Sequence, residues 1–133
     1  MSSLSRHWLG TTILIGMVYC AIGVLFALPS NQVRLWRPLA WVASVVIYAV
    51  HIGYEHFRRG SSSPATAWHT ALAVAIGAFG LAVAANVHEV FFTSSYRRAL
   101  ALALVLWPVL IGLPAFVVAL VMAYGLGLTR RLS

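Results

Sequence analysis

The sequence contains few charged residues, and almost none of them are negative. Only 8% of its 133 residues are charged, lysine and aspartate do not occur, and Glu55 and Glu89 are the two acidic side chains. Soluble domains carry about 25% charged residues. A chain that is 62% hydrophobic cannot cover a water-facing surface with so few charges, so we expect a lipid bilayer around it. The length predicts one domain, residues 1–133.

Cysteine and aspartate are scarce enough to exclude several kinds of site. Cys20 is the single cysteine and lies in an apolar run, which excludes an internal disulfide and multi-cysteine zinc sites. Without aspartate there is no Ser-His-Asp triad, and neither a P-loop nor a G-x-G-x-x-G fingerprint occurs. Glu55 and Glu89 are expected on opposite membrane faces, too far apart for paired-carboxylate chemistry. The sequence therefore predicts no catalytic residues and favours a non-enzymatic protein.

The basic residues mark the gaps between apolar runs. A nucleic-acid-binding protein gathers basic side chains on one face, whereas here they are spread along the chain as interfacial anchors and topology signals are. This pattern predicts no nucleic-acid partner. With four spans the two termini share one membrane side, which then carries five arginines against four on the other, and the positive-inside rule makes the five-arginine side cytoplasmic. The arginines are Arg6, Arg58, Arg59, Arg130 and Arg131 against Arg34, Arg37, Arg97 and Arg98.

Four apolar runs are long enough to be membrane spans. Crossing ~30 Å of hydrocarbon takes about 20 apolar residues in a helix, and we expect spans at about 8–28, 37–57, 65–90 and 97–127. Because the connections are short, neighbours in sequence should pack antiparallel. The predicted fold is an all-α membrane protein, an antiparallel four-helix transmembrane bundle with short loops, in a bacterial-type inner membrane. The first run exceeds the usual ~7–15-residue apolar core of a signal peptide, so we expect it to be retained as a helix.

Small residues indicate how these helices would pack. Helices associate in lipid where small side chains let the backbones approach. The third run is rich in alanine and glycine on all sides, which predicts a central position. In the fourth run Ala115, Ala119, Ala123 and Gly127 form a seam at four-residue steps, which fits either an oligomer contact or packing within one chain. The fourth run is also too long for an upright span, so it must tilt, project or bend at one of its two prolines.

The candidate site is a group of ionisable residues at the end of the second and start of the third span. His51 and Glu55 are four apart and share a helical face. His69 begins the third span on the same membrane side, and a short loop should bring it close to both. His56 is rotated by about 140° from His51 on an α-helix, at ~100° per residue, so we expect it to meet headgroups. His51, Glu55 and His69 are therefore the predicted constellation.

Three interpretations of this constellation remain open. His51 and His69 could ligate haem b, or a transition metal together with the carboxylate. A histidine–glutamate pair at a membrane edge could instead relay protons or ions, since such pairs titrate near neutral pH. Finally, the group could be structural, with interhelical hydrogen bonds and Glu55 paired to Arg58 or Arg59. A secondary polar group, Asn86, His88 and Glu89, is expected at the opposite surface.

The function predicted from these observations is that of a small polytopic integral membrane protein without enzymatic activity. It would act as an accessory subunit of a membrane complex or as a small oligomeric transporter or channel. The alternative is a haem b or metal-binding electron-transfer subunit that uses His51 and His69. Besides lipid, the expected partners are further copies of the chain or the subunits of a larger membrane complex.

Overall fold

The computed structural model describes residues 4–27, 33–92 and 97–132, and helices make up all of these ranges except residues 59–62. The helices are α1 (Leu4–Ala27), α2 (Val33–Gly53), the π-helix η2 (Tyr54–Arg58), α3 (Ser63–Phe92) and α4 (Arg97–Leu132). No strand occurs in the described ranges. The prediction of an all-helical chain is therefore confirmed for the part of the chain that the structure describes.

Each of the four long helices is long and apolar enough to cross a membrane. Their apolar windows run over Trp8–Leu25, Pro38–Arg58, Ser63–Val87 and Ala101–Thr129. These windows overlap the four predicted spans. Large apolar side chains line the outside of the helices, for example Leu14 and Val105. In lipid every backbone polar group must be satisfied within its own segment, which is why apolar runs of this length fold as helices.

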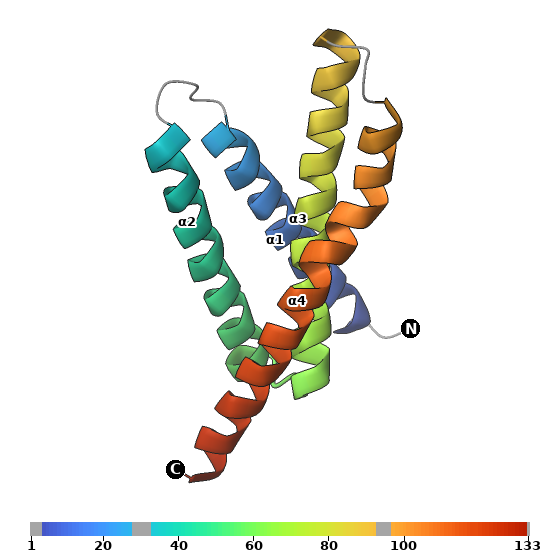
Figure 1. Cartoon of the computed structure of the whole chain (residues 1–133). Coiled ribbons are helices and arrows are strands. Elements are labelled where there is room, and N and C mark those ends of the chain that lie inside the picture. The colour runs from blue at the N-terminus through green and yellow to red at the C-terminus, as the bar shows by residue number, and fades with distance from the viewer. Residues whose placement is uncertain (1–3, 28–32, 93–96, 133) are drawn as a thin grey trace.

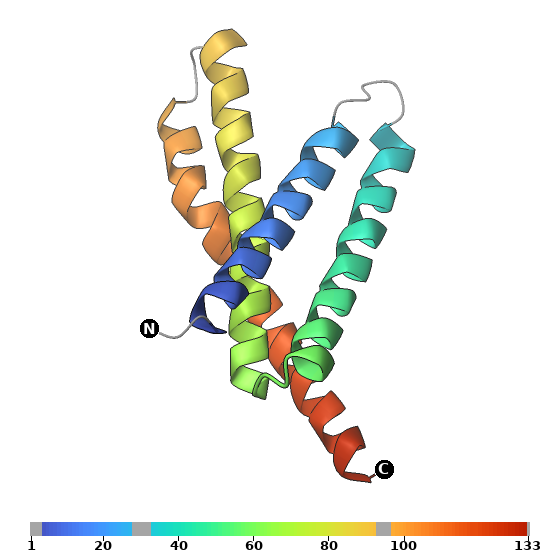
Figure 2. The ribbon, with the colours of Figure 1, turned by 180° about the vertical axis from the view of Figure 1, so that it is seen from behind.

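The four helices alternate in direction along the chain. Successive helices run in opposite directions, so α1 and α3 point the same way, and α1 begins and α4 ends toward the end where α2 meets α3 (Figure 1). From behind, α1 crosses in front of α3, while α2 stands apart from α3 except near their connection (Figure 2). Helix α3 packs against both α1 and α4, which confirms its predicted central position.

The contact between α1 and α3 depends on glycine at both surfaces. A Cβ atom added at Gly77 would lie 2.5 Å from Tyr19 Cβ, and one added at Gly80 would lie 2.6 Å from Cys20 Sγ. Gly16 on α1 is equally tight, because an added Cβ there would lie 2.6 Å from Ile76 Cγ2. These glycines let the two backbones approach, as small residues do between membrane helices.

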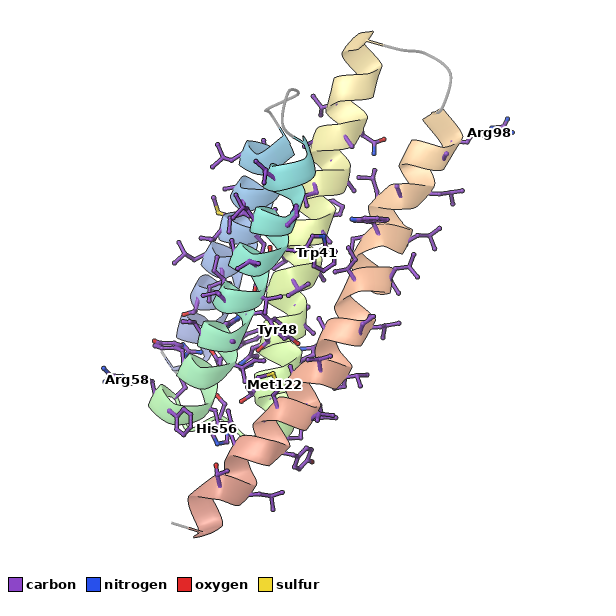
Figure 3. The ribbon with its side chains drawn as sticks, turned by 60° about the vertical axis from the view of Figure 1, so that its left-hand side comes forward. Trp41, Tyr48, His56, Arg58, Arg98 and Met122 are labelled. Carbon is purple, nitrogen blue, oxygen red and sulfur yellow. The ribbon has the colours of Figure 1, made fainter. Side chains whose placement is uncertain are left out.

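The small-residue seam of α4 is used within this chain. Ala119 and Ala123 are completely buried, and Ala119 belongs to a cluster with Ile52 of α2 and Ala67 of α3. Tyr48 of α2 donates a hydrogen bond to the carbonyl oxygen of Ala115 and lies between α2 and α4 (Figure 3). Packing inside the monomer therefore accounts for this part of the seam. At Gly127 an added Cβ would have no neighbour within 4 Å.

Helix α4 accommodates its prolines without interruption. Pro108 and Pro114 both lie inside a single helix of 36 residues. At ~1.5 Å per residue this helix is about 54 Å long, well beyond the ~30 Å of hydrocarbon. It runs obliquely past α3, and its C-terminal part extends beyond the ends of α2 and α3 (Figure 1). Relative to α2 and α3, helix α4 is therefore both inclined and longer (Figure 1).

Candidate functional site

A group of polar side chains is buried where α2 ends. Glu55 has no exposed surface, His51 is 1% exposed and His56 is 7% exposed. The helix widens here from α to π, and the Arg59 N–H donates to the Tyr54 carbonyl oxygen at 3.3 Å. Single π turns inside or at the end of α-helices are uncommon and frequent at functional sites. The carboxylate of Glu55 is thus buried inside the protein, although its helix ends three residues later at Arg58.

The turn after η2 directs the chain back over Glu55. Gly60 has a φ of 63°, a left-handed conformation that glycine adopts without steric cost. This reversal lets the Ser61 N–H donate to the Glu55 carbonyl oxygen at 3.2 Å. The Ser61 hydroxyl also donates to Glu55 Oε2 at 3.1 Å. The loop therefore supplies one hydrogen-bond donor to the buried carboxylate.

Two further groups contact the Glu55 carboxylate, one from α3 and one from the residue that follows η2. His69 Nδ1 of α3 lies 2.9 Å from Glu55 Oε2, and Arg59 donates from its guanidinium to Oε1 at 3.3 Å. An ionised carboxylate only accepts hydrogen bonds, so the His69 ring then donates from Nδ1. The guanidinium of Arg59 is partly exposed, with 20% of its side-chain surface accessible, whereas the Glu55 carboxylate is closed off. Hence the predicted meeting of Glu55 with His69 is present, and Arg59 is the arginine that pairs with Glu55.

The imidazole of His69 is fixed on a second side by α1. The rings of Trp8 and His69 stack with centroids 4.5 Å apart and an interplanar angle of 13°. The hydrogen bond to Glu55 and this stack together fix both the position and the orientation of the ring. Through Trp8, helix α1 therefore contributes to the site together with α3 and η2.

His51 lies one helical turn deeper than Glu55. Both of its ring nitrogens are buried and have no hydrogen-bond partner among the described residues. Glu55, His69 and Arg59 are all close enough to act on it electrostatically. All three predicted residues therefore gather at one place, with Glu55 and His69 in direct contact and His51 behind them.

The prediction that His56 meets the headgroups is wrong. His56 is 7% exposed, and neither of its ring nitrogens has a partner in the described part of the chain. It lies on the side of η2 that faces α4, while Arg58 points away into the surroundings (Figure 3). The predicted rotation assumed an α-helix, but a π turn takes up one residue more and returns the following side chain to the interior.

The secondary polar group at the far end of α3 is only partly described. Asn86 Nδ2 donates to the Ala82 carbonyl oxygen at 2.8 Å, within its own helix. His88 and Glu89 are helical, and their side chains lie outside the described residues. The prediction of a second polar site at this end therefore stays a prediction.

The described side chains include no group of three or more histidine, cysteine, aspartate or glutamate residues that could hold a metal ion. Glu55 and His69 are already engaged with each other, and Glu55 Oε1 faces Arg59. Carboxylate and imidazole side chains are groups that commonly accept and donate protons in proteins.

The fold and the site together define a class of small helical proteins. The four helices are long and apolar enough to cross a membrane, and a group of ionisable residues is buried at one end of the protein. No protein-family model matches the chain, and comparisons with curated proteins and with solved structures find no match either. The arrangement of its own residues therefore has to carry any functional conclusion.

Proposed function

We propose that the chain is a small polytopic integral membrane protein that moves protons, with the Glu55–His69 pair as the binding group at one membrane surface. The observation that carries this proposal is a fully buried carboxylate at hydrogen-bond distance from an imidazole, beside two more buried histidines. Ionisable residues within membrane spans are energetically costly, and they mark proton relays and ion pathways.

A purely structural role accounts less well for the same group. Hydrogen bonds between membrane helices contribute only ~0.6 kcal/mol each on average. Burying a polar atom costs about 1–3 kcal/mol unless another group satisfies it, and no described protein group pairs the ring nitrogens of His51 and His56. Stability alone would favour apolar residues at these two positions. A side chain that has to gain and lose protons is an exception to this preference, because an apolar residue cannot take its place in that role.

Orientation and assembly are parts of the same proposal. The arginine distribution supports cytoplasmic termini in a bacterial-type inner membrane. This orientation would place the Glu55 cluster, which consists of Glu55, His69, Arg59 and His51, on the cytoplasmic side. A chain of this size needs further copies, or a larger complex as an accessory subunit, to complete a path across the bilayer. The outer face of α2 is available for such contacts, with Trp41 74% exposed and Val50 65% exposed.

Proton flux into liposomes tests the proposal directly. The purified chain is reconstituted with a pH-sensitive dye inside, and a potassium gradient with valinomycin drives the protons. We expect Glu55→Gln to reduce the flux to that of protein-free liposomes. Glu89→Gln removes the same charge near the other end of α3 and should leave the flux intact.

A variant that retains the carboxylate separates chemistry from folding. Glu55→Asp should keep part of the flux that Glu55→Gln loses, provided that circular dichroism shows equal helix content. The proposal fails if the wild-type chain gives no more flux than empty liposomes, or if Glu55→Gln conducts like the wild type.

Haem b ligation by His51 and His69 is a second candidate, and one observation favours it. Imidazoles that bind a metal commonly donate their other ring N–H to a carboxylate, and Glu55 is positioned to receive that bond from His69 Nδ1. The visible absorption spectrum of the protein, purified from cells supplied with haem precursor, decides the matter. A Soret band supports this candidate, and its absence together with a metal-free elemental analysis removes it.

A further inference from the structure

Two kinds of neighbour cover the Glu55 carboxylate. His69 belongs to the long helix α3, and its ring is also stacked against α1. The other described side chains in hydrogen-bond contact with the carboxylate are those of Arg59 and Ser61, in the connection between η2 and α3. We call residues 59–61 the strap, because they bond Oε1 at one end and Oε2 at the other. One side of the carboxylate therefore faces long helices, and the other faces a short loop.

The hydrogen bonds that hold the strap are long. The Arg59 N–H donates to the Tyr54 carbonyl oxygen at 3.3 Å, and the Ser61 N–H donates to that of Glu55 at 3.2 Å. The two side-chain bonds to the carboxylate measure 3.3 Å and 3.1 Å. All four exceed the ~2.7–3.0 Å at which such bonds are most frequent. In contrast, the Thr66 N–H at the start of α3 bonds its acceptor at 2.9 Å. The strap is therefore bonded more weakly than the helix that follows it.

Packing adds little to hold the strap in place. Gly60 is exposed, Arg59 and Ser61 are partly exposed, and none of the three belongs to the buried core of the described residues. Segments with few buried apolar contacts open locally at a much lower free energy than the whole fold. At Gly60, where φ is 63°, even an added Cβ would have no neighbour within 4 Å. Rotation of the chain at this glycine is thus unobstructed.

The inner side of Glu55 offers no comparable opening. His51 and Ile52, on the preceding turn, are 1% and 0% exposed. Ile52 packs in one cluster with Ala67 of α3 and Ala119 of α4. Uncovering the carboxylate from this direction would require three helices to separate and would lose their close packing. The strap is therefore the part of the site whose movement exposes Glu55 at the lowest cost.

We propose that the strap is a gate. Its rotation about Gly60 withdraws the Arg59 and Ser61 side chains from the buried carboxylate and opens that carboxylate to water, while the helices stay in place. Water replaces the two donors when the strap opens, so hydrogen bonds are exchanged and not simply lost. The gate itself does not depend on proton movement, whereas its role as the point of proton entry rests on the proposed function.

Chemical labelling of Glu55 in lipid nanodiscs tests the gate. A water-soluble carbodiimide with an added amine converts an accessible carboxyl group into an amide, and the mass of the Glu55 peptide gives the rate. Gly60→Ala puts a Cβ at the left-handed φ of the closed strap, and we expect labelling to become about 5- to 30-fold faster. Gly60→Asn is the matched variant, because asparagine tolerates this conformation, and it should raise the rate much less.

Three further variants separate strap opening from general loosening. Gly77→Ala disturbs the α1–α3 contact and leaves the strap unchanged, so the labelling rate of Glu55 should stay as in the wild type. Ser61→Ala removes the hydroxyl that donates to Oε2 and should raise the rate about 2- to 10-fold. Ser62→Ala removes a hydroxyl from an exposed neighbour and should not raise it.

The outcomes for the gate and for the proposed function can be told apart. An equal rise in Gly60→Ala and Gly77→Ala would overturn the gate, because the carboxylate would then be reached by loosening of the whole fold. No rise in either Gly60→Ala or Ser61→Ala would overturn it as well, even with normal proton flux in the wild type. Faster labelling in both strap variants, without proton flux in the wild type, would support the gate and refute only the proposed function.

Discussion

The contribution of each Glu55 contact to the free energy of unfolding can be measured with two double-mutant cycles that share Glu55. The first combines Glu55→Gln with His69→Phe, which removes Nδ1 and keeps an aromatic ring for the stack on Trp8. The second combines Glu55→Gln with Arg59→Gln. Each cycle isolates the coupling energy of one pair from the cost of the single changes.

The geometry predicts different coupling energies for the two pairs. His69 Nδ1, from another helix, lies 2.9 Å from Glu55 Oε2, and the His69 side chain is only 15% exposed. Hydrogen bonds to charged groups contribute about 1.5–3 kcal/mol in soluble proteins, while those between membrane helices reach at most ~1.7, so we expect roughly 1–2 kcal/mol. Arg59 directly follows η2, four residues after Glu55, and contacts it at 3.3 Å with a partly exposed side chain. Pairs of that kind contribute about 0.3–0.5 kcal/mol.

Reversible unfolding by SDS in mixed micelles, followed by circular dichroism, gives the four free energies of unfolding in each cycle. The expected result is a coupling for Glu55–His69 that is at least twice that for Glu55–Arg59. Equal couplings, or a larger coupling to Arg59, would refute the conclusion that the interhelical hydrogen bond dominates this cluster.

Three further substitutions, two of them with a control variant, test the packing around the site. Gly77→Ala should destabilise the fold by about 1–3 kcal/mol, because α1 and α3 must separate to make room for the added Cβ. At Gly125 an added Cβ has no neighbour within 4 Å. Gly125→Ala should therefore be neutral or stabilising in the same SDS titration. Tyr48→Phe removes the hydrogen bond that links α2 to α4 and should cost about 0.6–1.7 kcal/mol, while Tyr54→Phe on the exposed surface should cost nothing measurable. Gly60→Ala puts a Cβ at a φ of 63° and should cost about 1–2 kcal/mol, and an unchanged free energy of unfolding would show that this turn is not held in the left-handed conformation.

The helices and the main contact of the site could be predicted because both depend on local spacing. Hydropathy locates four helices, since a segment in lipid has to satisfy its own backbone. The interval from His51 to Glu55 places both on one face, and the short connection to α3 brings His69 within reach. The contact at 2.9 Å between Glu55 and His69 follows from these two facts.

The rest of the site depends on features that the spacing does not encode. The burial of His56 follows from a π turn, and the sequence Tyr54–Arg58 contains no proline or glycine that would indicate one. The stack of Trp8 on His69 requires α1 to cross α3 at a particular place, which is set by contacts much further along both helices, such as Tyr19 against Gly77. An aromatic residue near a span end predicts depth in the membrane but not the neighbour that it meets.

Because the apolar windows of the helices differ in length, we expect the depth of the Glu55 cluster in a bilayer to depend on the thickness of that bilayer. Ala101–Thr129 of α4 has 29 residues and Trp8–Leu25 of α1 has 18, or about 43 Å and 27 Å at ~1.5 Å per residue. Both helices pack on α3, so they cannot each match the same hydrocarbon layer, and the mismatch has to be met by inclination or by local deformation of the lipid. Long acyl chains would then submerge the end that holds Glu55, and short ones would bring it to the headgroups. We therefore expect the exposure of that carboxylate to water to change with the length of the lipid chains.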